Sequence, residues 1–566
     1  MRRRARRPYD RGVSGDVETL IADAQAAAAA GRWTAARDAY AAAVDDAGPP
    51  AELGLAEALM WTGDPEGGVA HARRAYSGFR RAGELMYAGE AAILLYFLHR
   101  ESLGNVAAAS GWMARLERLV DEHGLEPLRG WALLVRSHDR GGRGDALGGV
   151  ALAEAASAAA RAGGDADLEL CGLAARGALL VQAGRLEEGL GLLDEAMAAS
   201  LAGEGARPDT LVFTSCCTIV SCSVSAQFAR AAQWIRASEA IAERTGSFHV
   251  HTTCRLHLGC VLVGTGRWDE AEAELAEAMR ISRTAEPVLF AEALARMAEL
   301  RLVQGRVDEA AALLDGVEDR ATSVPALAGV LLARGDPAAA AAVLRRRLRA
   351  VGDGCLEAAL LVELLAEAEV ARDGPGSAGR RARALARLAA DLGCDVVEAR
   401  AERALGLVAA AAGRPAAVDH LERALEAFCR LEMPLEAGRT HLLLAGALAG
   451  EAPDEAVAEA RAALAAFDAL GAARLADAAR ARLRALGVRA GPSGPRTLAL
   501  LTRRELEVLG LLADGMSNKD IADRLYLTRK TVEHHVHYVL VKLDLKNRAE
   551  AAAYAVRHHH ADSAPI

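Results

Sequence analysis

Polar side chains gather on one face of a helix that we predict to begin after Thr528, near the end of this 566-residue chain. Cationic and hydrogen-bonding groups on a helix face can contact phosphate oxygens and the edges of base pairs in a major groove. Such a face predicts a nucleic-acid contact, although a plain solvated helix face would have the same pattern. The residues on this face are Arg529, Lys530, Glu533, His534, His537 and Val541.

Four short predicted helices would hold this face in place. At the starts of three of them a capping side chain stands three residues before an acid, and Thr528 can cap the fourth. The three pairs are Thr502/Glu505, Ser517/Asp520 and Asn547/Glu550. Apolar residues at helical spacing can close a small three-helix core around a tight turn at Tyr526–Leu527. The predicted core residues are Leu506, Leu509, Leu512, Ile521, Ala522, Leu525, Val532, Val536, Val539, Leu540 and Leu543.

From Leu501 to Val556 the sequence resembles the LuxR-type DNA-binding domain. The resemblance lies in T-x-R-E-x-E-V-L, G-x-S-N-K-D-I-A and T-V-x-x-H-V, which run through the first three helices. It implies a helix-turn-helix whose second helix enters the major groove. It also implies that the last helix, Asn547–Val556, mediates dimerisation, although the same helix could simply cap the core.

The resemblance implies a role for each residue at this DNA contact. Lys519, Arg529, Lys530 and Thr531 are expected near phosphates, with Thr528 at the start of the same helix. Glu533, His534 and His537 match positions that face base edges. Glu533 departs from the more basic pattern of many relatives, and it would accept a hydrogen bond from cytosine N4 rather than donate to guanine. His535 lies nearer the core stripe, where it would be either a packed histidine or a phosphate contact.

A different pattern, with a period of about forty residues, fills the chain from near residue 30 to near residue 470. A glycine is followed by a polar residue and then by an Ala/Leu-rich helix, and a fixed period of this size predicts stacked helical hairpins. The glycine would supply the left-handed conformation that ends a helix. The clearest copies begin at Gly31, Gly184, Gly266, Gly305 and Gly413, and weaker ones begin near Gly63, Gly104, Gly144, Ala226, Gly335, Gly374 and Pro453.

These repeats resemble tetratricopeptide repeats in the longer, looser form found in large LuxR-family regulators. The resemblance implies a surface that binds a peptide, a protein partner or a small-molecule effector, and the alternative is a spacer without a ligand. Members of this kind usually carry an ATPase domain. A P-loop needs a lysine for the β- and γ-phosphates, and Lys519 is the first lysine in the chain, so we expect no P-loop here.

Charge divides the chain at the same place. Residues 496–566 hold eleven Lys and Arg against nine Asp and Glu, a net charge of +2, which leaves −11 for the preceding residues of a chain whose total is −9. Hydrophobic residues make up 52% and aromatic residues only 4%, which favours Ala/Leu helices over sheets. The nine scattered cysteines and the lack of a long apolar run predict a cytoplasmic protein with reduced thiols and no membrane contact.

One cluster of cysteines and histidines has a second interpretation. It comprises Cys216, Cys217, Cys222, Cys254, Cys260, His249, His251 and His257. His251 and Cys254 are three residues apart and could place two metal ligands on one helix face, but no C-x-x-C pair occurs. Buried thiols packed between repeat helices are the simpler interpretation. We therefore predict no metal, no cofactor and no catalytic residue.

The sequence predicts an all-α fold, a tetratricopeptide-like α-solenoid with a C-terminal four-helix helix-turn-helix domain. Its function would be transcription regulation, with the repeats sensing an effector or partner and a homodimer binding double-stranded DNA. The alternatives are a repeat scaffold whose helix-turn-helix binds a protein such as an RNA polymerase subunit, and a regulator-linked enzyme. The predicted segments are an Arg-rich disordered arm (1–15), the repeat domain (16–488), a linker (489–499), the helix-turn-helix (500–557) and a tail (558–566).

Overall fold

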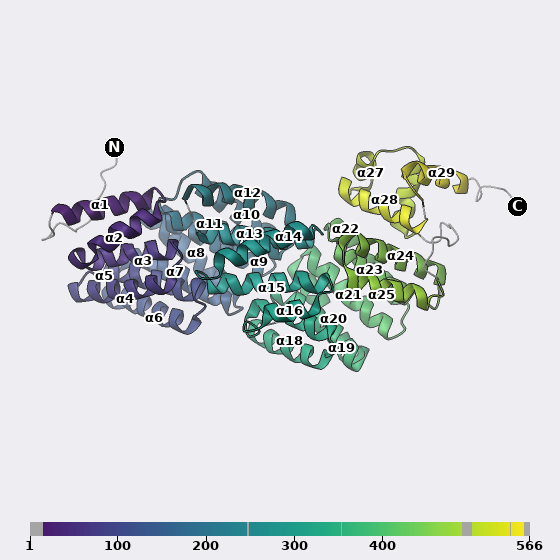
Figure 1. Cartoon of the computed structure of the whole chain (residues 1–566), viewed down its shortest axis with the longest axis horizontal. Coiled ribbons are helices and arrows are strands. Elements are labelled where there is room, and N and C mark those ends of the chain that lie inside the picture. Colours follow the sequence, from purple (N-terminus) through teal and green to yellow (C-terminus); the bar gives the residue numbers. More distant parts are fainter. Residues whose placement is uncertain (1–14, 246–247, 353, 489–500, 544, 560–566) are drawn as a thin grey trace. The chain divides into compact units, whose positions relative to one another are not determined.

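The structure is a computed structural model that describes residues 15–245, 248–352, 354–488, 501–543 and 545–559. All regular structure in these ranges is helical, as predicted (Figure 1). The predicted linker lies outside the described residues, as does the Arg-rich arm except for Gly15, which already belongs to the first helix. No helix among the described residues is long and apolar enough to cross a membrane.

The chain forms two compact units, each built from stacked antiparallel helices. The first takes in residues up to Ser223 together with Ala229–Leu258 and Glu274–Ala293. Its helices are α1 (Gly15–Ala29), α2 (Trp33–Ala47), α3 (Pro49–Trp61), α4 (Pro65–Ala82), α5 (Leu85–Phe97), the π-helical turn η1 (Leu98–Ser102), α6 (Val106–His123), α7 (Glu126–Gly142), α8 (Ala146–Gly163), α9 (Ala166–Gln182), α10 (Leu186–Leu201), α11 (Pro208–Val224) and α12 (Phe228–Thr245). The boundary between the units passes through α13 (Phe248–Gly264), α14 (Trp268–Ser282) and α15 (Pro287–Val303).

The second unit comprises Val224–Phe228, Gly259–Ala273 and the chain from Leu294 onward. Its repeat helices are α16 (Val307–Leu314), the 3₁₀ turn η2 (Ala321–Ser323), α17 (Val324–Ala333), α18 (Pro337–Val351), α19 (Leu356–Asp373), α20 (Pro375–Leu392), α21 (Asp395–Ala411), α22 (Ala416–Arg430), α23 (Pro434–Ala447), α24 (Pro453–Leu470) and α25 (Ala473–Ala485). Four shorter helices complete it, namely α26 (Arg503–Ala513), α27 (Asn518–Leu525), α28 (Arg529–Lys542) and α29 (Arg548–His559).

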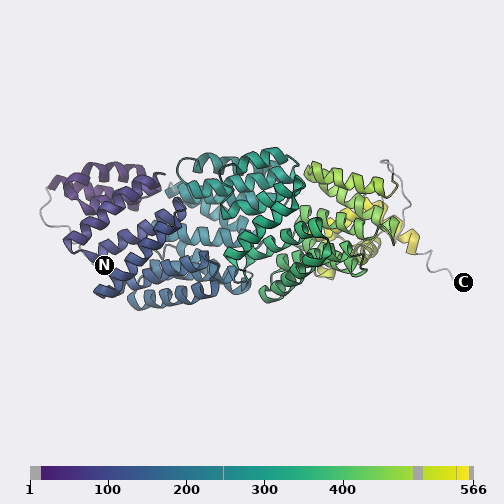
Figure 2. The same ribbon diagram turned by 90° about the horizontal axis from the view of Figure 1, so that it is seen from below.

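The repeat register follows the predicted glycines. The five clearest copies have a glycine with φ between +62° and +86°, followed within three residues by a new helix. Ala226, near which one of the weaker copies begins, takes the same left-handed conformation with φ of +58°. Many of the described repeat helices pack on their neighbours in sequence, and alternate helices also pack on the next helix but one, as α7 packs on α9. Figure 2 shows the helices from a second side. These contacts confirm tetratricopeptide-like helical hairpins.

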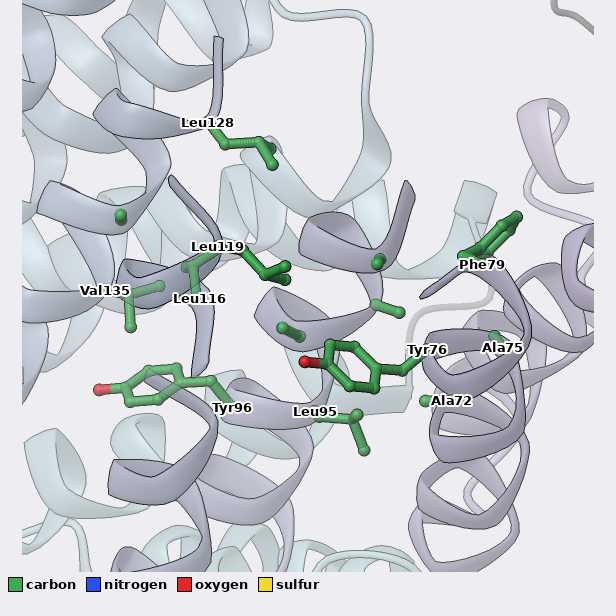
Figure 3. Packing of buried hydrophobic residues seen from close by; sticks show 14 of the residues in the cluster. Ala72, Ala75, Tyr76, Phe79, Leu95, Tyr96, Leu116, Leu119, Leu128 and Val135 are labelled. Carbon is green, nitrogen blue, oxygen red and sulfur yellow. The ribbon is translucent and has the colours of Figure 1, made fainter. Parts of the chain in front are cut away.

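Small residues let these helices approach closely, which explains the Ala- and Gly-rich composition. A Cβ added at Gly177 of α9 would lie 2.8 Å from the carbonyl oxygen of Gly189 of α10, so neither position tolerates a side chain. Larger residues fill the space between the helix pairs. Figure 3 shows Tyr76 of α4 pointing between Leu95 of α5 and Leu119 of α6, in a core that α4, α5, α6 and α7 share and to which Phe79 and Leu116 also belong.

Candidate nucleic-acid interface

The four C-terminal helices begin at the predicted capping residues. Thr502 and Ser517 form complete capping boxes with Glu505 and Asp520, in which each side chain bonds to the other residue's backbone N–H. The Thr528 hydroxyl accepts a hydrogen bond of 3.1 Å from the backbone N–H of Thr531. Tyr526 lies in the predicted tight turn, has a left-handed backbone and is 96% exposed. Local signals therefore fix the positions at which α26, α27 and α28 begin.

A small apolar core joins these helices, and most of the predicted residues belong to it. The buried members are Leu501, Val508, Leu509, Leu511, Leu512, Ile521, Ala522, Val532, Val536, Val539, Leu543, Leu545, Ala551, Tyr554 and Ala555. The prediction for Leu506 was wrong, because that side chain is 40% exposed and Val508 takes its place. Leu525 and Leu540 are only partly buried.

Helix α29 packs on α26 and extends the predicted helix at its C-terminal end. Asn547 caps it with a bond of 3.0 Å to the backbone N–H of Glu550. Arg548 anchors its first turn to Asn518 at 2.5 Å and to the carbonyl oxygen of Met516. The helix runs to His559 rather than Val556, so the predicted tail (558–566) begins inside it.

Most of the predicted DNA face points outward. Lys519, Thr528, Arg529, Glu533 and His537 are exposed, and Arg529 Nε donates to Glu533 at 3.2 Å across one helical turn. Val541, the apolar member of the face, is half-buried. These side chains come from the start of α27 and one side of α28, which is the arrangement that a groove-binding helix needs.

Two residues of the predicted site have surroundings that the sequence did not indicate, and the neighbouring His535 is the packed histidine that was one of its two predicted alternatives. Thr531 is fully buried, and its hydroxyl lies 2.7 Å from the hydroxyl of Thr528, so it does not face outward. His535 is buried, and burial together with the positive charge of Arg504 lowers its pKa to about 4. His534 is half-buried, and burial and then Lys530 lower its pKa as well. Neutral imidazoles can both donate and accept at a base edge.

Comparisons with known proteins agree on this segment. Residues 499–555 match the family described as bacterial regulatory proteins, luxR family. The transcriptional regulatory protein LiaR of Bacillus subtilis (strain 168) is 51% identical over 59 residues, which are 10% of this chain and 28% of that protein. The oxygen regulatory protein NreC of Staphylococcus haemolyticus (strain JCSC1435) is 48% identical over 58 residues, 10% of this chain and 27% of that protein. The chain thus spans less than a third of the length of either relative.

These residues form a LuxR-type helix-turn-helix domain. Among solved structures, the chain is similar to one of the APC/C hetero-tetramer Cut9–Hcn1, with 12% identity over 82% of this chain and 96% of that chain and a TM-score of 0.34. It is also similar to a Rap protein complexed with competence and sporulation factor, with 13% identity over 57% of this chain and 98% of that chain and a TM-score of 0.36.

The LuxR-type domain contains a buried lysine that the sequence analysis did not single out. Lys542, at the end of α28, is 1% exposed, and its ammonium donates to Glu505 of α26 at 2.9 Å. It also donates to Glu459, which lies on repeat helix α24. Burial alone would lower the pKa of Lys542, but the two carboxylates outweigh it and raise that pKa. The sequence signal that could have indicated the burial of Lys542 is its position between the core residues Val539 and Leu543.

Helix α28 therefore contacts repeat helices α22 and α24 as well as its own domain. Glu459 also lies 2.5 Å from Nδ1 of His441 on α23, whose ring packs edge-on against Tyr538 at 4.5 Å between centroids. At the other end of α28, Lys530 Nζ donates to Glu432 at 2.8 Å. These contacts lie within the second unit and involve one side of α28 along its whole length.

The cysteine–histidine cluster lies on α11 and α13. Cys222 and Cys254 are buried, and burial raises the pKa of Cys222 to about 12, which disfavours the thiolate form that binds metal. In the described ranges, no group of three or more His, Cys, Asp or Glu side chains is arranged to hold a metal ion.

Proposed function

We propose that this chain is a transcription regulator that binds double-stranded DNA through α28 of its LuxR-type domain. The observation that carries the proposal is the exposed polar face of α28 inside a segment that matches a family of bacterial regulatory proteins. The repeat helices would receive an effector or a protein partner and transmit its presence to this domain. We propose a homodimer on DNA and no enzymatic activity.

We expect two kinds of contact with DNA, one with phosphates and one with base edges. Lys519 and Arg529 would bind phosphates and position the domain without reading sequence. Glu533, His534 and His537 would meet base edges, where Glu533 accepts from cytosine and a neutral imidazole donates or accepts. Lys530 would join the phosphate contacts, and Thr528 would place the N-terminus of α28 near the backbone. Thr531 has no direct role in this proposal because its side chain is buried.

The test compares two variants of the full chain on random-sequence duplex and on duplex selected from genomic fragments by the protein. Lys519→Ala should weaken binding to both and flatten the plot of log affinity against log salt by about one unit. His537→Ala should weaken the selected duplex by about 1–3 kcal/mol and leave random duplex nearly unchanged. Both side chains are exposed, so neither change should affect folding.

Arg349→Ala is a matched control, because it removes an exposed charge from repeat helix α18 rather than from the LuxR-type domain. It should leave both affinities and the salt slope unchanged. If neither the full chain nor any variant of it binds duplex at low salt, or if the binding ignores salt, the proposed function fails. A protein contact, such as one with a polymerase subunit, would then be the better account of α28.

A further inference from the structure

We infer that repeat helices α22–α24 hold α28 in a position that excludes DNA, so that this contact is autoinhibitory. The inference rests on the proposed function, because α28 must be the helix that enters the groove. Four residues at intervals of four form a strip along α28, and each meets or approaches the repeat helices. We call this the docking strip, and it comprises Lys530, His534, Tyr538 and Lys542.

The docking strip shares its residues with the DNA face. Lys530 is a proposed phosphate contact, and its ammonium is bonded to the Glu432 carboxylate. His534 is a proposed base contact, and the same Glu432 is one of the charges that act on its pKa. A carboxylate therefore stands where a phosphate oxygen would have to come. The Glu432 carboxylate would repel a phosphate brought to the same ammonium, so DNA and Glu432 compete for Lys530.

The space around α28 also excludes DNA in this arrangement. An α-helix with its side chains is about 10–12 Å across, and the major groove is about 12 Å wide, so a bound helix has DNA walls on both flanks. In this structure α22 and α24 pack on one flank of α28, and Tyr538 in the middle of that flank is buried against His441. The repeat helices occupy the place of one wall. Binding therefore requires that α28 first leave them.

The backbone at Glu432 indicates that this contact has a function of its own. Glu432 lies between α22 and α23 with φ of +57°, a left-handed conformation that costs a non-glycine residue about 1–2 kcal/mol. In the next hairpin the sequence Phe467-Asp-Ala-Leu-Gly471 aligns with Phe428-Cys-Arg-Leu-Glu432, and Gly471 has φ of +73° at the equivalent place. A glutamate thus replaces the glycine that the turn favours, and its carboxylate bonds to Lys530.

The buried end of the contact can separate while each of its buried charged groups keeps one partner. When α28 leaves, Lys542 keeps the bond to Glu505 of its own domain, and Glu459 keeps the hydrogen bond to Nδ1 of His441 of its own hairpin. A buried charge left with no partner is the main cost of breaking such a cluster, and these two bonds reduce that cost. The contact is therefore suited to a reversible switch.

The experiment measures binding of a labelled random-sequence duplex to the full chain at low salt. Glu432→Gly restores the turn residue of the neighbouring repeat and removes the carboxylate, so it should fold and bind duplex about two- to fivefold more tightly, as loss of an exposed ion pair allows. Glu459→Gln weakens the buried end and should bind about tenfold more tightly. Glu432→Gln keeps the native backbone and should behave like Glu432→Gly. Circular dichroism checks that the helices remain.

Glu451→Gln is the control, because Glu451 is an exposed carboxylate in the turn before α24 and is neither of the two carboxylates bonded to the docking-strip lysines from the repeat helices. It should bind duplex like the unaltered protein. Equal affinity in all five proteins would overturn the inference and leave the proposed function standing, and so would a gain in Glu451→Gln as large as in Glu432→Gly. Absence of duplex binding by every protein would overturn both. Binding by the variants but not by the unaltered protein would support both.

Discussion

His535 should make the stability of α28 depend on pH. Its ring is 5% exposed, and its Nε2 has no hydrogen-bond partner among the described residues. Burial and, to a smaller extent, the positive charge of Arg504 lower the pKa of His535 from its ordinary value of 6.5 to about 4. Any opening that returns the ring to water restores the ordinary pKa, so the open state binds the proton first. Stability should fall as pH drops below 6.5, and the loss should be complete near pH 4.

The size of the effect follows from the two pKa values. Each pH unit between them is worth about 1.4 kcal/mol, so the whole difference is about 3 kcal/mol. At pH 5 the open state is almost fully protonated while the buried ring stays largely neutral, so the expected loss between pH 7 and pH 5 is about 2 kcal/mol. That loss corresponds to about thirtyfold in the opening equilibrium of α28.

Hydrogen exchange of the α28 backbone amides in the full chain measures this opening at both pH values, after correction for intrinsic exchange rates. His535→Phe keeps a ring of similar size but cannot titrate, so its protection should change about thirtyfold less between pH 7 and pH 5. His537→Phe makes the same change at an exposed position on the same helix and should retain the pH dependence of the unaltered protein. If His535→Phe and the unaltered protein lose protection equally, His535 is not the group responsible and the reasoning fails.

Two further predictions concern the stability of the LuxR-type domain. Lys542→Met leaves Glu459 and Glu505 buried together without their cation and should destabilise the region around α28 by about 3–5 kcal/mol, whereas adding Glu459→Gln and Glu505→Gln should recover most of that loss in thermal melts. A fragment of residues 496–566 should be helical and only marginally stable by circular dichroism, because its core from Leu501 to Ala555 is complete but small. An unfolded fragment would show that the domain depends on the repeat helices for its fold.

The LuxR-type domain could be predicted from sequence because its signals are local. The capping pairs at Thr502 and Ser517 and the turn at Tyr526 act over three or four residues, and the structure contains all of them. Leu506 shows the limit of such a reading. A spacing of three advances 300° around a helix, so Leu506, Leu509 and Leu512 drift by 60° at each step and do not stay on one face. Val508 and Leu509 complete the buried side instead.

The docking strip could not be predicted, for a physical reason. Hydrophobic periodicity identifies helix faces that bury apolar atoms. The docking strip instead consists of lysines, a histidine and a tyrosine, which such a pattern assigns to the solvent-exposed face. Its partners Glu432 and Glu459 are 98 and 83 residues away in the chain from Lys530 and Lys542. Local sequence carries no signal for such pairs. The alignment of two hairpins does give a signal, because Glu432 stands at the position that Gly471 occupies in the next hairpin.

The polar character of the docking strip determines how easily the contact can open. An apolar interface of this length would leave an exposed hydrophobic patch on α28 after separation, and such patches promote association with other proteins. Here the separated surfaces are ammonium, imidazole, phenol and carboxylate groups, which water solvates. To move the equilibrium from 1:99 to 99:1, an effector must bind the open form about 5.5 kcal/mol more tightly than the closed one. An effector bound to the α22–α24 face could supply that difference by taking over Glu432 and Glu459, because each bond it makes there is unavailable to α28.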